Sequence, residues 1–358
     1  MTDKRLVYVG TYTDPIAHVP DSTGEGIYLY ELDLTDGSLT WLDTMAGIVN
    51  PSYLAFSPDR TALYAVSELN ERGGHVASFS IRPSDGTLEY LNQQPAHGQA
   101  ACYLVADVTG QYVLTANYMD GSACVYPIRD DGSLDDASQR IEHHGSGPNP
   151  RQDRAHIHCV TFDRSARFVF LSDLGMDKLV GYSLDLDKGQ LVPHNETSIQ
   201  PGGGPRHFAF SPDGRFGYSL QELDGSIVVF EYDEVKGELH PIQTVSTLPE
   251  GFEGENITST LLIHPSSRFL YAANRGHNSI AIYLINQDRG TLEVVDWQPT
   301  GGTWPRDFNI DPSGRYLLVG HQDSDNIVTF QIDQETGSLQ PVAESEVPTP
   351  VCIRFLEV

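Results

Sequence analysis

Short segments in which apolar and polar residues alternate recur along the whole chain, and each is followed by a turn that contains Gly-x-Leu. SIVVFEY (226–232) precedes KGEL (236–239), and NIVTFQI (326–332) precedes TGSL (336–339). Alternation with a period of two residues is typical of a half-buried β-strand, and a glycine-containing turn joins such a strand to an antiparallel partner. The turn occurs seven times, as DGSL (36–39), DGTL (85–88), DGSL (131–134), KGQL (188–191), KGEL (236–239), RGTL (289–292) and TGSL (336–339).

A second pattern consists of an apolar strand, a turn similar to Ser-Pro-Asp-Gly-Arg, and a further apolar strand. FAFSPDGRFGYSL (208–220) and FNIDPSGRYLLVG (308–320) are two copies. The last apolar residue before the turn is a marker position, which recurs every 47 to 56 residues in six complete copies. Four strands in a repeat of about this length are typical of a β-propeller blade. The marker residues are Phe56, Ala106, Phe162, Phe210, Ile263 and Ile310.

The two ends of the chain supply the strands of the seventh copy. The C-terminal PVCIRFLEV (350–358) matches only the first strand of this pattern, and the N-terminal RLVYVGTY (5–12) matches only the second. We therefore predict that the last strand completes the first blade and closes the ring. The predicted fold class is all-β, with residues 1–358 forming a single domain, a seven-bladed β-propeller of four-stranded antiparallel blades.

Aligning the blades on the marker position places polar residues at one mouth of the central channel. In a propeller the first strand of each blade lines the channel, and its start lies beside the end of the second strand. Arg206, Arg306 and His158 lie four residues before the marker, and Glu222 and Arg275 lie twelve residues after it. We expect these five side chains to converge in a concave ligand site. The alternative is a cluster that binds only channel water or joins adjacent blades. The same two positions hold Ser52, Cys102, Ser259 and Val351, and Tyr12, Glu68, Tyr118, Leu174 and Gln322.

The charge of the chain narrows the partners that such a site can have. The 49 acidic residues outnumber the 22 basic residues, for a net charge of −27, which argues against nucleic acid and anionic membranes. An anionic ligand would therefore need local cations. No apolar run approaches the length of a membrane span, and the start MTDKRLVYVG lacks the apolar region of a signal peptide. The four cysteines lack C-x-x-C spacing, so we predict a cytoplasmic protein with reduced thiols.

Three long segments resemble one known family. They are GPRHFAFSPDGRFGYSLQELDGSIVVFEY (204–232), FLYAANRGHNSIAIY (269–283) and PRDFNIDPSGRYLLVGHQDSDNIVTFQI (305–332). They are similar to the propeller-type 6-phosphogluconolactonases of bacteria, in the lactonase family that also includes fungal carboxymuconate lactonising enzymes. One departure is Gln221, where the family commonly has asparagine. The resemblance implies that the site residues are His158, Arg206, Glu222 and Arg275, with Arg306 as a further candidate.

The function implied by this resemblance is hydrolysis of a sugar lactone, with 6-phosphogluconolactone of the pentose phosphate pathway as the expected substrate. Glu222 or His158 would take a proton from water, and arginines would stabilise the oxyanion and bind the anionic end of the substrate. The catalytic prediction is Glu222, His158 and Arg275. The predicted substrate-binding residues are Arg206, Arg306, His207, His156 and His321.

Three alternatives remain open at this stage. The first is an enzyme that acts on a non-phosphorylated sugar lactone, and the second is a muconate-type cycloisomerase on the same scaffold. A non-catalytic interaction propeller is the third, although such modules usually display apolar patches where this rim is polar.

No cofactor is expected, but two sets of residues keep a divalent cation open. His156 and His158 have the spacing of two residues on one face of a strand, and a set of polar residues at the channel, Asn117, Asp173 and Asn274, suits a hard cation. The polar loop 139–154 could extend Arg151 and Arg154 over the mouth. The expected partner is a small anionic sugar lactone, and the expected assembly is a monomer or a simple homo-oligomer.

Overall fold

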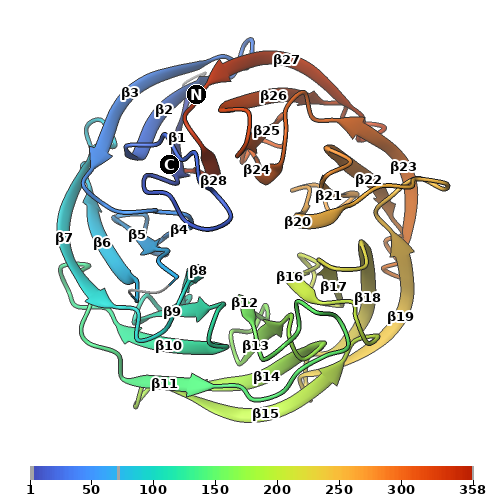
Figure 1. Cartoon of the computed structure of the whole chain (residues 1–358), viewed down its shortest axis with the longest axis horizontal. Helices are drawn as coiled ribbons and strands as arrows, with labels where there is room; N and C mark the ends of the chain where they lie inside the picture. Colours follow the sequence, from blue (N-terminus) through green and yellow to red (C-terminus); the bar gives the residue numbers. More distant parts are fainter. Residues whose placement is uncertain (1–3, 71–72, 357–358) are drawn as a thin grey trace.

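Each repeat folds into one sheet of four antiparallel strands, and seven such sheets surround a central axis (Figure 1). The computed structural model describes residues 4–70 and 73–356, and within these ranges every regular element is a strand. The prediction of an all-β, seven-bladed propeller is confirmed. None of the described residues belongs to a helix that could span a membrane.

The strands of each sheet follow one another in sequence, except that the last strand of the chain joins the first sheet. The first sheet contains β28 (Pro350–Phe355), β1 (Lys4–Thr11), β2 (Gly26–Asp33) and β3 (Leu39–Ala46). The next three contain β4 (Leu54–Phe56), β5 (Ala62–Ser67), β6 (His75–Ile81) and β7 (Leu88–Pro95); β8 (Ala101–Ala106), β9 (Tyr112–Asn117), β10 (Ser122–Pro127) and β11 (Gln139–Glu142); and β12 (Ile157–Phe162), β13 (Phe168–Asp173), β14 (Lys178–Asp185) and β15 (Gln190–Ser198). The last three contain β16 (Pro205–Phe210), β17 (Phe216–Gln221), β18 (Ser226–Asp233) and β19 (Glu238–Ser246); β20 (Ile257–Ile263), β21 (Phe269–Arg275), β22 (Ser279–Ile285) and β23 (Leu292–Pro299); and β24 (Pro305–Ile310), β25 (Tyr316–His321), β26 (Asn326–Ile332) and β27 (Leu339–Glu346).

The ring closes through hydrogen bonds between the two ends of the chain. β28 is antiparallel to β1, with Phe355 opposite Val7 and Cys352 opposite Gly10. In Figure 1 the dark red β28 lies beside the blue β1, on the side of the first blade that faces the channel. The predicted split blade is therefore confirmed. The N-terminal strand β1 has the C-terminal strand β28 as its partner on the channel side, so the edge of β1 is covered.

The recurring turns join neighbouring blades as well as neighbouring strands. The hydroxyl of Tyr218 donates to the carbonyl of Gly290 at 3.0 Å, and that of Tyr271 donates to the carbonyl of Gly337 at 2.8 Å. Both glycines belong to the Gly-x-Leu turn of the next blade. Gly290 has φ +70°, and a Cβ there would lie 2.3 Å from the ring of Phe216. Glycine is therefore required both by the backbone conformation and by the close approach of the aromatic ring.

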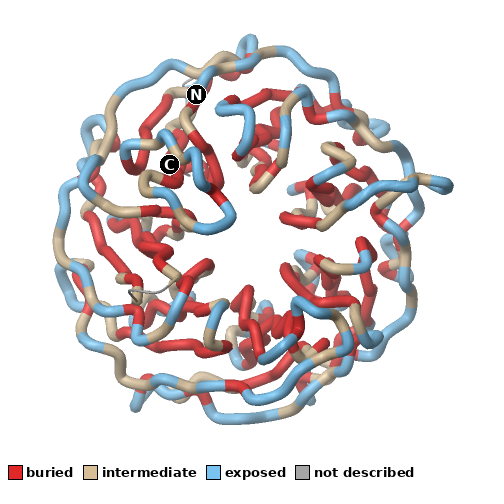
Figure 2. Tube along the Cα trace, in the orientation of Figure 1, coloured by how far each residue is buried: buried red, intermediate tan, exposed pale blue. Residues whose placement is uncertain are grey.

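Burial divides each blade into an inner part and an outer strand. In Figure 2 the strands near the channel are largely buried, whereas the outermost strands alternate between exposed and half-buried residues. All six residues of β17 are buried, but β19 is exposed or half-buried at every residue except one. The inner strands are consequently held by packing on both faces, which fixes the side chains that they present to the channel.

Candidate active site

A β-bulge recurs near the start of the inner strands, and it occurs at the position that the alignment selected. In β16 the register shifts between Pro205 and His207, and in β24 it shifts between Pro305 and Asp307. The residue between them, an arginine in both strands, is left outside the regular pairing. Bulges re-aim a side chain and are enriched next to active sites. The corresponding bulged residues of β8, β12 and β28 are Cys102, His158 and Val351.

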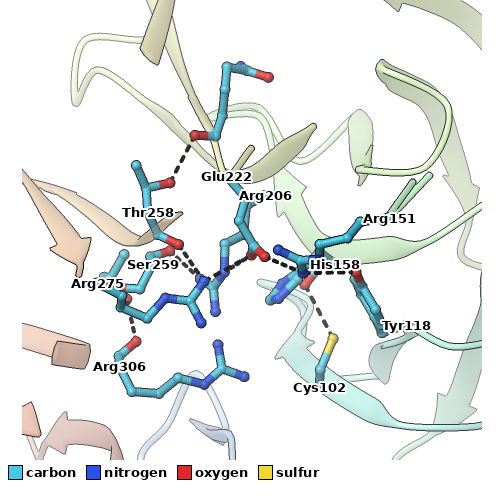
Figure 3. A network of polar contacts seen from close by, with 12 residues as sticks. Cys102, Tyr118, Arg151, His158, Arg206, Glu222, Thr258, Ser259, Arg275 and Arg306 are labelled. Carbon is cyan, nitrogen blue, oxygen red and sulfur yellow. Dashed lines mark hydrogen bonds and ion pairs between the residues drawn. The ribbon is translucent and has the colours of Figure 1, made fainter. Parts of the chain in front are cut away.

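These bulges surround a cavity of about 350 Å³ at one mouth of the channel, shown in part in Figure 3. Residues from six of the seven blades and from two loops reach it, so the site exists only in the closed ring. The lining residues are His18, Glu68, Cys102, Tyr118, Arg151, His158, Glu222, Ile257, Arg275, Trp304 and Arg306. The predicted convergence of His158, Glu222, Arg275 and Arg306 is found, and Arg206 lies directly beside Glu222.

Glu222 is the centre of a cluster of three guanidinium groups. Its Oε1 lies 2.6 Å from Arg151, and its Oε2 lies 2.8 Å from Nε of Arg206 and 3.1 Å from Arg275. Burial alone would raise the pKa of Glu222, but Arg275, Arg151 and Arg206 hold it well below its usual range. The carboxylate is therefore ionised at neutral pH, and both of its oxygens are occupied.

Arg206 and Arg275 are held from behind by main-chain carbonyls. Arg206 donates to the carbonyl of Ser259, and Arg275 donates to that of Thr258 at 2.5 Å. Burial and the neighbouring arginines lower the pKa of each, but a guanidinium is not deprotonated in proteins. Their Nε atoms are buried and make no aligned hydrogen bond with any described residue. The guanidinium of Arg275 lies 5.5 Å from the centroid of the Trp304 ring. Trp304 has a backbone φ of +62°, which is unusual for a bulky residue.

A second carboxylate lies in the same cavity. Glu68 accepts hydrogen bonds on Oε2 from the hydroxyls of Tyr12 at 2.9 Å and Ser52 at 2.5 Å. Nε2 of His18 lies 3.9 Å from the other oxygen, Oε1. Burial lowers the pKa of Arg306, but Tyr12, Glu68 and Glu222 together raise it above its usual value. Arg306 is therefore a charged guanidinium near Glu68, and in Figure 3 it points toward the guanidinium groups of Arg206 and Arg275.

His158 is a buried, neutral imidazole at the cavity. Burial, Arg206 and Arg306 lower its pKa well below the usual value, and its Nδ1 has no hydrogen-bond partner within the described ranges. The ring of Tyr118 packs edge-on to it at 5.7 Å between centroids. Burial raises the pKa of Tyr118 to about 12, so its hydroxyl is a neutral donor. Together they offer polar groups that carry no charge beside the arginines.

Three histidines that were predicted to bind substrate do not line this cavity, although the ring of His207 lies 5.8 Å from that of His158. His156 stacks on Tyr118 at 4.5 Å, and its ring nitrogens contact the Tyr118 carbonyl and Asp153. His207 follows the bulge and faces the opposite end of the channel. His321 is buried beside the carbonyl of Asn326, with the pKa of its imidazole lowered to about 4 by burial. His207 follows the bulged Arg206 in β16, and its side chain contacts a different cavity from the one that Arg275 and Arg306 line.

Sequence reasoning singled out some lining residues and missed others. Arg151 was expected over the mouth, and it does reach the cavity from its loop, whereas Arg154 pairs with the exposed Asp153 instead. Glu68 occupies the same repeat position as Glu222, which is a signal that could have selected it. His18 had no such signal, because its loop has no counterpart in the other repeats.

The residues considered for a cation are occupied by local contacts. Asp173 accepts hydrogen bonds from His143 and from the main chain of His156, each at 2.8 Å. Asn117 and Asn274 donate to the main-chain carbonyls of Ala96 and Thr247, each of which directly follows the outermost strand of the preceding blade. Among the described residues, no group of three His, Cys, Asp or Glu side chains is placed to hold a metal ion.

Comparison with known proteins agrees with this geometry. The family model of the seven-bladed β-propeller lactonases matches residues 6–355. The 6-phosphogluconolactonase of Bacillus subtilis is 38% identical over 308 residues, which cover 86% of this chain and 85% of that protein. The chain therefore belongs to the seven-bladed β-propeller lactonase family, and it is a lactone hydrolase.

Two solved structures share the fold along almost the whole chain. The periplasmic gluconolactonase of Pseudomonas aeruginosa is 33% identical, with a TM-score of 0.93 over 99% of both chains. A protein of Bacteroides fragilis, provisionally named a 6-phosphogluconolactonase, is 34% identical, with a TM-score of 0.92 over 99% of both chains. The similar proteins thus carry names for both phosphorylated and unphosphorylated lactones.

Proposed function

We propose that the protein hydrolyses 6-phosphogluconolactone to 6-phosphogluconate, in the cytoplasm, as a monomer or a simple homo-oligomer. The observation that carries this proposal is the charge of the cavity. Four arginines, Arg151, Arg206, Arg275 and Arg306, surround only two carboxylates, so two positive charges have no counterpart within the site. A phosphate monoester carries about two negative charges at neutral pH and would balance them.

The strongly negative net charge makes this local excess informative. A chain with a net charge of −27 repels anions at long range, so an anionic ligand can be bound only where cations are concentrated and shielded. The arginines satisfy both conditions, because Arg206 and Arg275 are buried and their Nε atoms lack aligned partners among the residues described. Guanidinium groups also match phosphate and carboxylate oxygens with paired N–H donors.

The cluster also suggests separate roles for its members. Glu222 holds Arg151, Arg206 and Arg275 in one array, so we assign it to positioning these guanidiniums rather than to proton transfer. Some of the arginines would bind the phosphate, and the others would stabilise the oxyanion that forms when water attacks the lactone carbonyl. His158, being neutral and free at Nδ1, would form a hydrogen bond with a hydroxyl of the sugar.

A non-phosphorylated sugar lactone is the second candidate, because one similar structure is a gluconolactonase. A muconate-type cycloisomerase would also use the arginines, since its substrate is a polycarboxylate. A propeller that only binds other proteins would leave the surplus positive charge of this cavity unexplained.

A direct test compares the hydrolysis of freshly generated 6-phosphogluconolactone with that of gluconolactone, by pH-stat and with subtraction of the spontaneous rate. We expect saturable turnover of the phosphorylated lactone, with kcat/KM at least tenfold above that for the plain lactone. Equal or better turnover of gluconolactone would contradict the proposed substrate. The same assay with EDTA tests whether a divalent cation takes part.

A further inference from the structure

The two glutamates of the cavity occupy the same position in two repeats but have different surroundings. Glu68 lies twelve residues after Phe56, and Glu222 lies twelve residues after Phe210. Both are buried, at 4% and 2% exposure, and both line the cavity. The second and fifth blades, which contain them, lie on different sides of the ring (Figure 1). They form a matched pair in which only the partners differ.

The partners of Glu222 make its carboxylate a weak proton acceptor. Three guanidiniums lie within 2.6 to 3.1 Å of its two oxygens. Opposite charges at such distances stabilise the ionised form and therefore oppose the uptake of a proton. A general base must also have an oxygen free to contact water, and both oxygens of Glu222 face cations.

Among the described residues Glu68 forms no ion pair with an arginine, and the charged Arg306 acts on it only from a longer distance, so Glu68 is better suited to that role. Both of its hydrogen bonds, from Tyr12 and Ser52, are made to Oε2 and come from neutral hydroxyls. No described side chain donates a hydrogen bond to Oε1, and Nε2 of His18 lies 3.9 Å from it. The two hydroxyls fix the orientation of the carboxylate, and Oε1 is the oxygen left for a water molecule in the cavity.

The same cluster connects the carboxylate to solvent. The Tyr12 hydroxyl, which donates to Glu68, lies 3.3 Å from Nε2 of His18. The side chain of His18 is 48% exposed, whereas Glu68 and Tyr12 are buried. His18 is therefore a possible proton acceptor at the rim, and the Tyr12 hydroxyl alone separates it from Glu68.

We propose that Glu68 is the general base of lactone hydrolysis, with Tyr12 and Ser52 as its positioning residues. This inference rests on the lactone hydrolase activity and not on which lactone is the substrate. Oε1 of Glu68 takes a proton from water while the water oxygen bonds to the carbonyl carbon, giving a tetrahedral oxyanion beside the arginines. The bond from this carbon to the ring oxygen then breaks, and the ring oxygen takes the proton from Glu68. The new carboxylic acid loses its own proton to solvent, so lactone and water yield carboxylate, hydroxyl and one proton.

The test compares Glu68→Gln with Glu222→Gln, the same substitution at the matched position. Glutamine at 68 can still accept the hydrogen bonds from Tyr12 and Ser52, but it cannot take a proton. We expect its kcat to fall by about 10²- to 10⁴-fold, with KM within threefold of the wild-type value. In Glu222→Gln we expect KM to rise at least tenfold, because the array of arginines loses its common partner. Both kinetic constants are measured on whichever lactone the wild type hydrolyses.

Chemical rescue separates a base from a structural carboxylate. In Glu68→Ala, formate added to the assay would occupy the space of the missing carboxylate. We expect kcat of this variant to be at least tenfold higher with formate than without it. Retained inhibition by 6-phosphogluconate, or by gluconate if the plain lactone is the substrate, shows that the cavity is still formed. A kcat of Glu68→Gln within threefold of wild type, or a loss in Glu68→Ala that formate leaves unchanged, would overturn the assignment.

The substrate and the base are judged separately in this design. Wild-type turnover of gluconolactone alone contradicts the phosphorylated substrate, while the ratio of Glu68→Gln to wild type on gluconolactone still decides the base. Turnover of neither lactone would overturn both proposals.

Discussion

Each end of the central channel contains an arginine that is paired with a buried carboxylate, but only at the far end do the charges balance. At the far end, Arg354 donates to Asp307 at 2.9 Å and to the carbonyls of Leu54 and Ile353 at 3.0 and 2.6 Å. Its guanidinium also lies 4.4 Å from the centroid of the Tyr53 ring. One cation thus faces one anion, and the remaining donors have main-chain acceptors.

The near end has more cations than its carboxylates can balance. Three guanidiniums share Glu222, a fourth belongs to Arg306, and Nδ1 of His158 is buried without a partner in the described part of the chain. Buried polar groups are normally satisfied, and a like-charged cluster is costly unless something compensates it. We therefore interpret the Arg354–Asp307 pair, whose charges balance, as a contact that holds strands together. The arginine cluster around Glu222 has surplus positive charge, and we interpret it as a site for an anion.

The largest effects should come from removing one arginine at each end. In Arg354→Met, Asp307 loses its cation while remaining buried, so we expect the free energy of unfolding to fall by about 3–5 kcal/mol. In Arg275→Met, like-charge repulsion is relieved, so we expect a stability change under about 1 kcal/mol. Its kcat/KM should fall by about 10²- to 10³-fold, because a donor to the developing charge is lost.

Urea unfolding and kcat/KM at one temperature check both halves of this prediction. The folded fraction of Arg354→Met should retain a kcat/KM within about threefold of wild type. A loss of stability in Arg275→Met as large as that in Arg354→Met would show that the near cluster is also structural, and the contrast between the two ends would fail.

An anion should stabilise the protein through the near end alone. Inorganic phosphate that binds only the folded state adds about 2.7 kcal/mol at a hundred times its dissociation constant. We expect thermal unfolding of the wild type and of Arg354→Met to shift upward by similar amounts in phosphate, and that of Arg275→Met to shift much less. Chloride at equal ionic strength is the control for screening. A shift that survives in Arg275→Met would place the anion elsewhere.

The sequence predicts the ring better than it predicts the contents of the channel. The alternation in SIVVFEY and the recurring Gly-x-Leu turns indicate the strands of each blade, so the fold and the number of blades followed from counting repeats. The match of residues 350–358 to a single strand indicated that the ring is closed by the C-terminus. The rim residues followed from the same alignment because the bulge recurs at one repeat position, as at Arg206 and Arg306.

The parts that could not be predicted depend on irregular backbone. His18 reaches the cavity from a loop that the repeat alignment does not cover, and Arg151 was expected over the mouth only from the position of its loop, without its contact to Glu222. The alignment could not show that His207 lines another cavity than Arg306, because the bulge at Arg206 interrupts the regular alternation of side chains in this strand. The difference between Glu68 and Glu222 lies in partners that come from their own blades, from adjacent blades and from the loop of Arg151, and the repeat position alone does not determine these partners.

The smallest predicted effect concerns a buried histidine that belongs to neither end. His321 ends β25, at the repeat position that holds Asn117 and Asn274 in two other blades. Those asparagines donate to main-chain carbonyls at 3.2 and 2.8 Å, so Asn fits this position. His321→Asn should therefore fold, with a free energy of unfolding within about 1 kcal/mol of wild type at pH 7.

The variant should nevertheless change the dependence of stability on pH. Burial lowers the pKa of His321 to about 4, whereas an unfolded histidine titrates near 6.5. Between these values the unfolded chain binds a proton that the folded chain does not, so stability present above pH 6.5 is lost as the pH falls toward 4. His321→Asn should flatten this slope by up to about 1.4 kcal/mol per pH unit, measured by urea unfolding from pH 7 to 4.5. An unchanged slope would mean that the buried imidazole is protonated in the folded ring, because only then does its removal leave proton uptake on unfolding unaltered.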